Sequence, residues 1–111
     1  MSKFMIIYNA QEQAVDFMAQ STPEQIEAGM QSWMDWKSGI PETVNFEFGS
    51  PLQSVGRITA DGVVDSDSKI SGYSIMEGES KERIIEALKS HPHLKRLGAT
   101  IDVVEMVQPV K

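Results

Sequence analysis

The sequence of 111 residues contains no cysteine, and this absence excludes several kinds of site together. Disulfide bonds, thiol nucleophiles, thiolate zinc sites and iron–sulfur clusters all require cysteine. Long apolar runs are also missing, because the longest one near the N-terminus, Phe4 to Ile7, is far too short for a membrane span or a signal-peptide core. We therefore expect a cytoplasmic protein with no membrane partner.

Basic residues are fewer than acidic ones. The chain has 10 lysines and arginines against 16 acidic residues, which gives a net charge of −6 and a pI near 4.8. A field of this sign repels phosphate backbones, so no nucleic-acid partner is expected. No glycine-rich phosphate loop and no Gly-x-Ser-x-Gly elbow occurs. The two histidines, His91 and His93, are too few to build a metal site, so we expect neither a metal nor a cofactor.

What remains is an ordinary globular composition, with 41% hydrophobic and 23% charged residues, over a length that suits a single domain at residues 1–111. Its apolar periodicity predicts four strands, two helices and a hairpin. We expect the strands at residues 3–8, 44–48, 72–76 and 100–107, the helices at 22–39 and 80–90, and the hairpin at 55–65 around Asp61-Gly62. Residues 11–20 indicate one or two loose helical turns.

The helix at residues 22–39 has clear start and stop signals. Thr22 can cap it, Pro23 suits the first helical position, and Gln25 completes a capping box. Gly39 is expected to end the helix in a left-handed conformation. The apolar stripe is predicted at Ile26, Met30, Trp33 and Lys37.

The order of these elements predicts a ferredoxin-like α+β fold, βαββαβ, with an extra β-hairpin. Two helices cover only one face of a four-stranded sheet. We expect the other face to carry Phe4, Ile6 and Tyr8, and an apolar face of this kind needs a partner. Pairing of two copies through it would form a dimeric α+β barrel, with pockets near the seam between the two sheets.

Five stretches spread over nearly the whole chain stand out by their order and spacing. They are the Lys-Phe-Met-Ile-Ile-Tyr strand at 3–8, the helix at 23–39 with its two tryptophans, the Gly-x-Pro-Leu turn at 49–52, Ile-Ser-Gly-Tyr-Ser-Ile at 70–75, and His-Pro-His-Leu at 91–94 leading into Ala-Thr-Ile-Asp-Val at 99–103. Together they resemble the YCII-related family, including its DGPF branch. The resemblance implies a dimeric ferredoxin-like α+β barrel.

The sequence departs from that family at the positions that would carry chemistry. Residues 65–68 read Asp-Ser-Asp-Ser where the DGPF branch has Asp-Gly-Pro-Phe. YCII-like proteins carry a proposed dyad of a histidine on the first long helix and an aspartate before a proline after the second. Here the first long helix has no histidine, and His91 stands before Pro92. The resemblance therefore implies no particular activity for this chain.

Two functions are compatible with these residues. In the first, a pocket between the sheet and the long helix binds a small, partly aromatic molecule, and His91 moves a proton in an elimination or isomerisation without a cofactor. Trp36, Tyr8 and Tyr73 would line this pocket, with His93 beside them. Asp35, Asp65 or Asp67 would supply a carboxylate partner.

In the second, the chain is a non-catalytic homodimeric scaffold or binding protein. His91 and His93 would then shape the turn after the second helix, the tryptophans would belong to the core and the dimer contact, and Asp65 would be a solvated turn residue.

Overall fold

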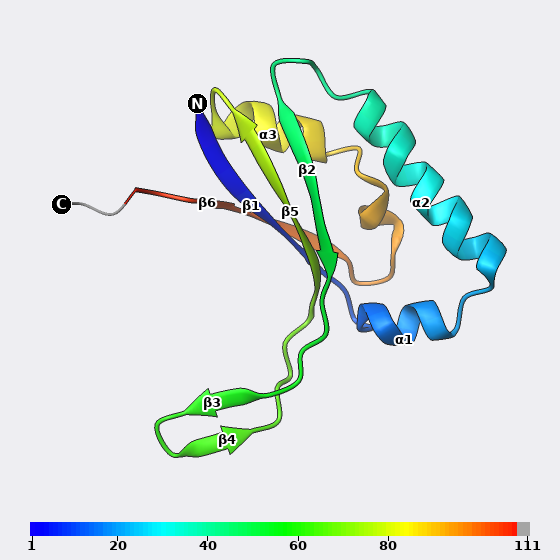
Figure 1. Ribbon diagram of the computed structural model, residues 1–111, viewed down its shortest axis with the longest axis vertical. Coiled ribbons are helices and arrows are strands. Elements are labelled where there is room, and N and C mark those ends of the chain that lie inside the picture. The colour runs from blue at the N-terminus through cyan, green and yellow to red at the C-terminus, as the bar shows by residue number, and fades with distance from the viewer. Residues whose placement is uncertain (109–111) are drawn as a thin grey trace.

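A four-stranded antiparallel sheet organises the structure, a computed structural model that describes residues 1–108. Its strands are β1 (Ser2–Asn9), β2 (Asn45–Pro51), β5 (Ile70–Gly78) and β6 (Thr100–Glu105), in the spatial order β2-β5-β1-β6. Every neighbouring pair is antiparallel. The fold is α+β, and this strand order is compatible with a ferredoxin-like arrangement (Figure 1).

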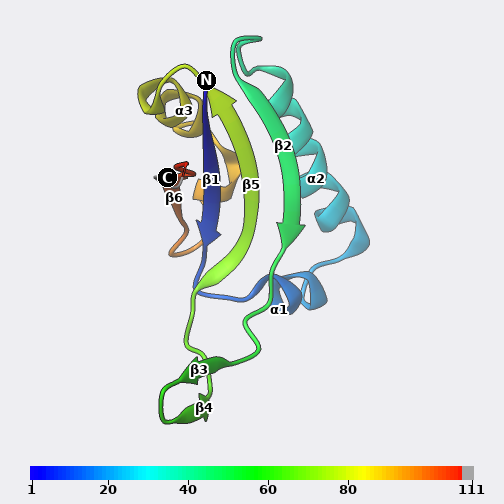
Figure 2. The same cartoon turned by 60° about the vertical axis from the view of Figure 1, so that its left-hand side comes forward.

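The helical segments within residues 1–108 are α1 (Ala14–Ala19), α2 (Pro23–Ser38), α3 (Lys81–Leu88) and the short 3-10 helix η1 (Pro92–Lys95). The sheet stands in front of both α2 and α3 in Figure 2, so the two helices cover the same face. The loose turns expected over residues 11–20 form α1.

The predicted long helix is confirmed as α2, and its capping box between Thr22 and Gln25 forms in both directions. The predicted left-handed end is wrong, because Gly39 has a φ of −88°. Its backbone N–H donates to the carbonyl of Trp36 over 3.0 Å, three residues back. This tightened last turn satisfies the helix end without a left-handed residue.

The core lies between the sheet and the helices. Side chains from β1 and β5 meet those of α3 there, and the buried apolar residues include Phe4, Ile6, Tyr8, Met76, Ile84 and Leu88. The expectation that Phe4, Ile6 and Tyr8 lie on the uncovered face is therefore wrong. Both faces of β1 are apolar, so alternation defines two sets of residues but does not say which set the helices cover.

The uncovered side of the sheet, called the open face below, carries the opposite set of side chains. Its apolar residues are Met5, Ile7, Tyr73, Ile75 and Val104. They share this face because Met5 pairs with both Ile75 and Val104, and Ile7 pairs with Tyr73. No helix within residues 1–108 covers them (Figure 2).

Only a narrow face of helix α2 packs against the sheet. Ile26, Trp33 and Trp36 are its half-buried residues, and Gly29 lies on the same face between Ile26 and Trp33. The predicted stripe is wrong at Met30, which is 67% exposed, and at Lys37, which is also exposed. Spacings of 26-30-33-37 and 26-29-33-36 both fit a helix, and packing of the two indole rings decides between them.

Strands β3 (Arg57–Thr59) and β4 (Gly62–Val64) form a separate two-stranded sheet. It projects beyond the end of the main sheet, as Figure 1 shows. All six residues of these strands are exposed, among them Ile58 at 83% and Val63 at 76%. Gly62 has a φ of +132°, which explains glycine in this turn.

Candidate functional site

Polar side chains gather inside the apolar core where β1 and β5 pass beneath the turn after α3. Tyr8 comes from β1, Ser74 from β5, and His91 and His93 from η1 and the residue that precedes it. None of the four is more than 2% exposed. Buried polar groups need partners, and each of these side chains has one.

A chain of hydrogen bonds determines the protonation of the His91 ring. The backbone N–H of His93 donates to His91 Nδ1 over 3.0 Å, so Nδ1 carries no proton. The neutral ring then carries its proton on Nε2, which donates to the Tyr8 hydroxyl over 3.3 Å. Tyr8 in turn donates to Ser74 Oγ over 2.7 Å, which leaves the Ser74 hydroxyl proton for another acceptor.

Burial keeps the two titratable groups of this chain, His91 and Tyr8, neutral. It lowers the pKa of His91 to about 3, and the nearby His93 lowers it further. It also raises the pKa of the Tyr8 hydroxyl to about 12, against the opposing effect of the hydrogen bond with Ser74. A His91 ring with so low a pKa is a weak base at neutral pH. Among residues 1–108, no carboxylate forms a hydrogen bond with it.

His91 also has a structural role at this turn. Its Nδ1 caps η1, and its backbone N–H donates to the Leu88 carbonyl at the end of α3 over 3.0 Å. Its ring lies between the two indoles of α2, with ring centroids 4.3 Å from both Trp33 and Trp36. The side chain therefore connects α3, η1 and α2.

His93 is the histidine that reaches a cavity. Its Nε2 donates to the carbonyl of Asn9 over 2.8 Å, and its ring centroid lies 5.1 Å from that of Tyr8. Burial lowers the pKa of His93, while hydrogen bonding to the backbone of Asn9 and Thr100 opposes this shift. Its ring therefore tends to be neutral as well.

Between the sheet and the helices α1 and α2 lies a cavity of about 570 Å³, called the inner cavity below. Its walls are apolar and come mainly from Phe17, Met18, Ile26, Met30, Trp33 and Phe48. Its floor carries the polar groups of Tyr8, Ser71, Ser74 and His93, and its rim carries Lys95 and Arg96. An apolar space of this size with a few polar groups is typical of small-molecule sites.

Gly29 contributes backbone to the wall of the inner cavity. This glycine occupies an inward position of α2 between Ile26 and Trp33 and lines the cavity. A Cβ atom placed on it would meet nothing within 4 Å. Glycine inside a helix costs about 1 kcal/mol relative to alanine, and no contact within residues 1–108 requires it here.

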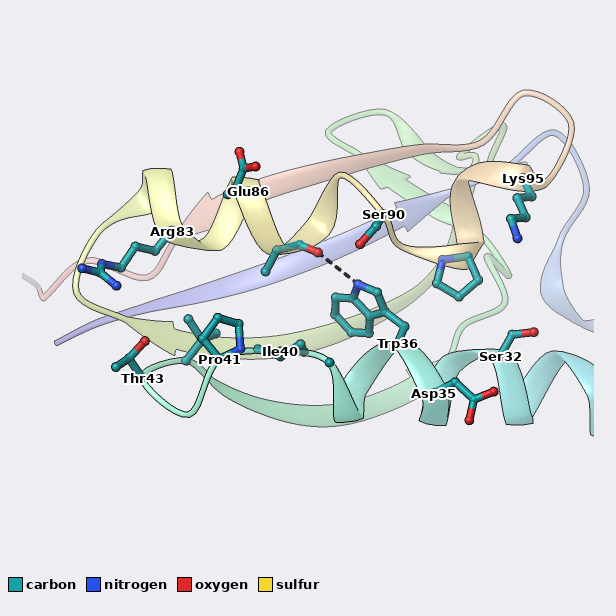
Figure 3. Close-up of a pocket in the computed structure, with 14 residues that line it drawn as sticks. Ser32, Asp35, Trp36, Ile40, Pro41, Thr43, Arg83, Glu86, Ser90 and Lys95 are labelled. Carbon is teal, nitrogen blue, oxygen red and sulfur yellow. Dashed lines mark hydrogen bonds between the residues drawn. The ribbon is translucent and has the colours of Figure 1, made fainter.

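A second cavity, called the α2–α3 groove, has a volume of about 780 Å³ and is shown in Figure 3. Trp36 lies in its middle, and its indole N–H donates to the Ala87 carbonyl of α3 over 3.0 Å. Charged side chains border the groove, with Arg83 and Glu86 on α3, Asp35 on α2, and Lys95 on η1. Lys95 borders both cavities.

The structure brings four of the six candidate residues together. Ring centroids of Tyr8 and His91 lie 5.0 Å apart, Trp36 packs on His91, and His93 packs on Tyr8. Of the four, Tyr8 and His93 line the inner cavity, Trp36 lines the α2–α3 groove, and His91 lies beneath both.

Tyr73 and Asp65 are separate from this cluster. Tyr73 borders the inner cavity but alternates with Ser74, so its ring belongs to the open face, where it packs over Gly49. Asp65 is exposed beyond the end of β4 and lines neither cavity. It is not a hydrogen-bond partner of His91.

Sequence reasoning missed Ser74, Gly29 and Arg96 as site residues and gave Trp36 the wall position that Trp33 occupies in the inner cavity. One usable signal was the glycine in the middle of an otherwise well-formed helix, on the same face as Trp33. A serine between apolar strand residues was another.

No family model, no curated protein and no solved structure matches this chain. None of the helices in residues 1–108 is long and apolar enough to cross a membrane. Within the same range, no three histidine, aspartate or glutamate side chains are grouped as they would be around a metal ion.

Proposed function

We propose that this chain is a YCII-like, cytoplasmic homodimer that binds a small organic molecule in the inner cavity without transforming it. The observation that carries the proposal is the inner cavity itself, with apolar walls around Trp33, a polar floor at Tyr8 and Ser74, and space at Gly29. Its volume of about 570 Å³ lies in the range of small-molecule sites. The strand order compatible with a ferredoxin-like fold also fits the resemblance to the YCII-related family.

Binding without catalysis is favoured by the state of His91. Its pKa of about 3 makes it a weak base, Nδ1 and Nε2 are both engaged, and it borders neither cavity. A general base must reach the proton that it abstracts. The neutral ring instead orders Tyr8 and Ser74 beneath the ligand.

Proton-transfer catalysis is the second candidate. The observation in its favour is the chain from His91 through Tyr8 to Ser74, which connects a buried imidazole with the floor of the inner cavity. Such chemistry would need the pKa of His91 to rise on ligand binding. A measurable turnover that disappears in His91→Asn but survives in His93→Asn would favour this candidate.

The surface of the isolated chain supports a dimer. Its accessible area is 7855 Å², whereas a monomeric protein of 12.3 kDa exposes about 6,100 Å². Its radius of gyration is 15.6 Å, against about 13 Å for a compact domain of this length. The projecting β3–β4 hairpin accounts for part of this excess, and a standard interface buries roughly 800 Å² on each partner.

The open face is the surface that we assign to the second copy. Its apolar residues form one contiguous group, with Ile75 paired to Met5 between the edges of the sheet. The inner cavity lies on the opposite, helix-covered side. The ligand site is therefore separate from the dimer seam, and not beside it as the sequence analysis expects.

Ligand binding is tested by thermal-shift screening against small aromatic and hydroxy-acid compounds, because a ligand that binds the folded state raises its melting temperature. Gly29→Leu should place a side chain in the inner cavity between Ile26 and Trp33 and reduce the shift, while Gly29→Ala should keep it. Gly29→Ala is the matched control, since it adds helix propensity and only one methyl group. The proposal fails if no compound shifts the wild type, or if Gly29→Leu leaves the shift unchanged.

The dimer is tested by sedimentation equilibrium at micromolar concentration, where the wild type should have twice the mass of one chain. Ile75→Lys places a charge in the open face and should give monomers. Ile85→Lys is the control, because Ile85 is an exposed isoleucine on α3, away from that face. A monomeric wild type, or a dimer that Ile75→Lys leaves intact, would exclude this interface.

A further inference from the structure

We propose that the ligand of the inner cavity is an organic carboxylate, whose charged group binds Lys95 and Arg96 while its apolar body lies against Trp33. This inference rests on the proposed function and adds the chemical class of the ligand. It depends on the distribution of charge around the inner cavity and on the geometry of Arg96.

The inner cavity has a charge bias opposite to that of the protein. Its charged lining residues are Lys95 and Arg96, and no aspartate or glutamate within residues 1–108 lines it. The chain as a whole carries a net charge of −6. Two neighbouring cations at the mouth of an apolar space in an acidic protein give it a local preference for anions.

Arg96 is held in position at this rim. Its guanidinium carbon lies 4.0 Å from the centroid of the Phe17 ring on α1, and one Nη donates to the Glu12 carbonyl over 3.2 Å. A guanidinium has five N–H donors, so several stay available for a ligand. Arg96 makes no ion pair with any carboxylate in residues 1–108.

The position of Arg96 suits a carboxylate. Burial lowers the pKa of Arg96 and the charge of Glu12 opposes this effect, so the group keeps its positive charge, as arginine does in proteins. A planar guanidinium binds a planar carboxylate through two parallel hydrogen bonds. Lys95 is exposed and adds a second, more mobile charge next to it.

The apolar walls of the inner cavity indicate what the uncharged part of the ligand is like. Trp33 and Phe48 both line the cavity, and their rings are stacked at 28° with centroids 6.4 Å apart. Met18 and Met30 bring flexible thioethers from α1 and α2 to the other walls. A flat or branched hydrocarbon body fits such walls. A cationic group would be repelled by Lys95 and Arg96, and Glu12, whose charge acts on Arg96, lies outside the lining of the cavity.

The test compares three probes that share one ring system: naphthalene-2-carboxylate, the neutral naphthalene-2-carboxamide, and the cationic 2-naphthylmethylammonium. Isothermal titration calorimetry of the full chain should show the carboxylate binding about tenfold or more tighter than the carboxamide, as expected for a charge-assisted hydrogen bond at a half-buried site. The ammonium should bind most weakly.

Charge variants then locate the carboxylate. Lys95→Gln with Arg96→Gln should lower the affinity for naphthalene-2-carboxylate to that for the carboxamide, and leave the carboxamide unchanged. Lys81→Gln with Lys89→Gln changes the net charge equally on exposed positions of α3 and its C-cap and should have no effect. If the Arg96 variant unfolds, Lys95→Gln alone should still weaken carboxylate binding about threefold, because an exposed ion pair contributes little.

The outcomes separate this inference from the function on which it rests. Equal affinities for carboxylate and carboxamide, with both weakened in Gly29→Leu, would leave the binding function standing and overturn the choice of a carboxylate. Tightest binding of the ammonium would overturn it as well. Carboxylate binding that Gly29→Leu leaves unchanged would place the anion outside the inner cavity and would also overturn this inference. Failure of all three probes, together with no hit in the thermal-shift screen, would overturn both proposals.

Discussion

The free energy of unfolding should fall in acid because of His91. In the folded protein burial lowers the pKa of His91 from 6.5 to about 3, whereas the unfolded chain has the ordinary value of 6.5. Below pH 6.5 the unfolded state binds a proton that the native state does not bind. The free energy of unfolding therefore falls as the pH decreases from 6.5 towards 3, and the stabilisation is complete only above pH 6.5.

The magnitude follows from that linkage. Within this window one such histidine lowers the free energy of unfolding by about 1.4 kcal/mol for each pH unit. From pH 7.5 to pH 5 the loss is about 2 kcal/mol, and any folded-state pKa below about 4 gives the same result. The prediction therefore does not depend on the depth of the shift. His93, whose pKa is also lowered, adds to the loss in the same direction.

The assay is urea denaturation at fixed protein concentration, at pH 7.5, 6.5, 5.5 and 5, on the wild type and His91→Asn. The asparagine oxygen can replace Nδ1 as acceptor for the His93 N–H, while the titrating ring is removed. The variant should be less stable than the wild type at pH 7.5, and the difference should shrink by about 2 kcal/mol at pH 5.

His93→Asn serves as the matched control, because it keeps the titration of His91. Nitrogen NMR of the wild-type ring should show a proton on Nε2 and no titration above pH 5. Parallel pH profiles for the wild type and His91→Asn, or a ring that titrates near pH 6.5, would refute the reasoning.

Two further substitutions test the packing that supports the site. Gly49→Ala should destabilise the fold by more than about 2 kcal/mol, as expected for overpacking, because the new Cβ would lie 2.6 Å from the Tyr73 ring. Gly39→Ala is the control, because its new Cβ would lie 3.5 Å from its nearest neighbour, the Trp36 carbonyl. Equal urea midpoints for the two variants would contradict the prediction. Trp36→Phe should lower the free energy of unfolding in urea by about 1–2 kcal/mol, because the Ala87 carbonyl loses the indole N–H as its donor. An unchanged urea midpoint would contradict this and show that water replaces the donor.

Local signals were sufficient for most of the fold. Thr22 and Gln25 form the expected capping box, and the alternating residues of β1 form the expected strand, because both patterns depend on neighbours in sequence. Which face of β1 is covered depends on where α2 and α3 pack. With apolar residues on both faces, the sequence could not distinguish Phe4, Ile6 and Tyr8 from the residues of the open face.

The site was predictable only in part, for a related reason. Tyr8, His91, His93 and Trp36 do converge, since β1, α2 and the turn after α3 meet at one place. Tyr73 was expected on the same wall, although its neighbour Ser74 takes the inward position on β5. The chain of hydrogen bonds needs distances between residues up to 83 positions apart, which no local pattern supplies.

The bond between Trp36 and the Ala87 carbonyl attaches one half of α2 more firmly than the other. The last carbonyls of any helix have no partner inside the helix, and this indole supplies one for α3. Lifting the C-terminal half of α2 would break that bond and separate two indoles from His91. The N-terminal half is half-buried only at Ile26, with Gly29 beside it. Local opening of α2 should therefore start at its first turns and not at the tryptophan end.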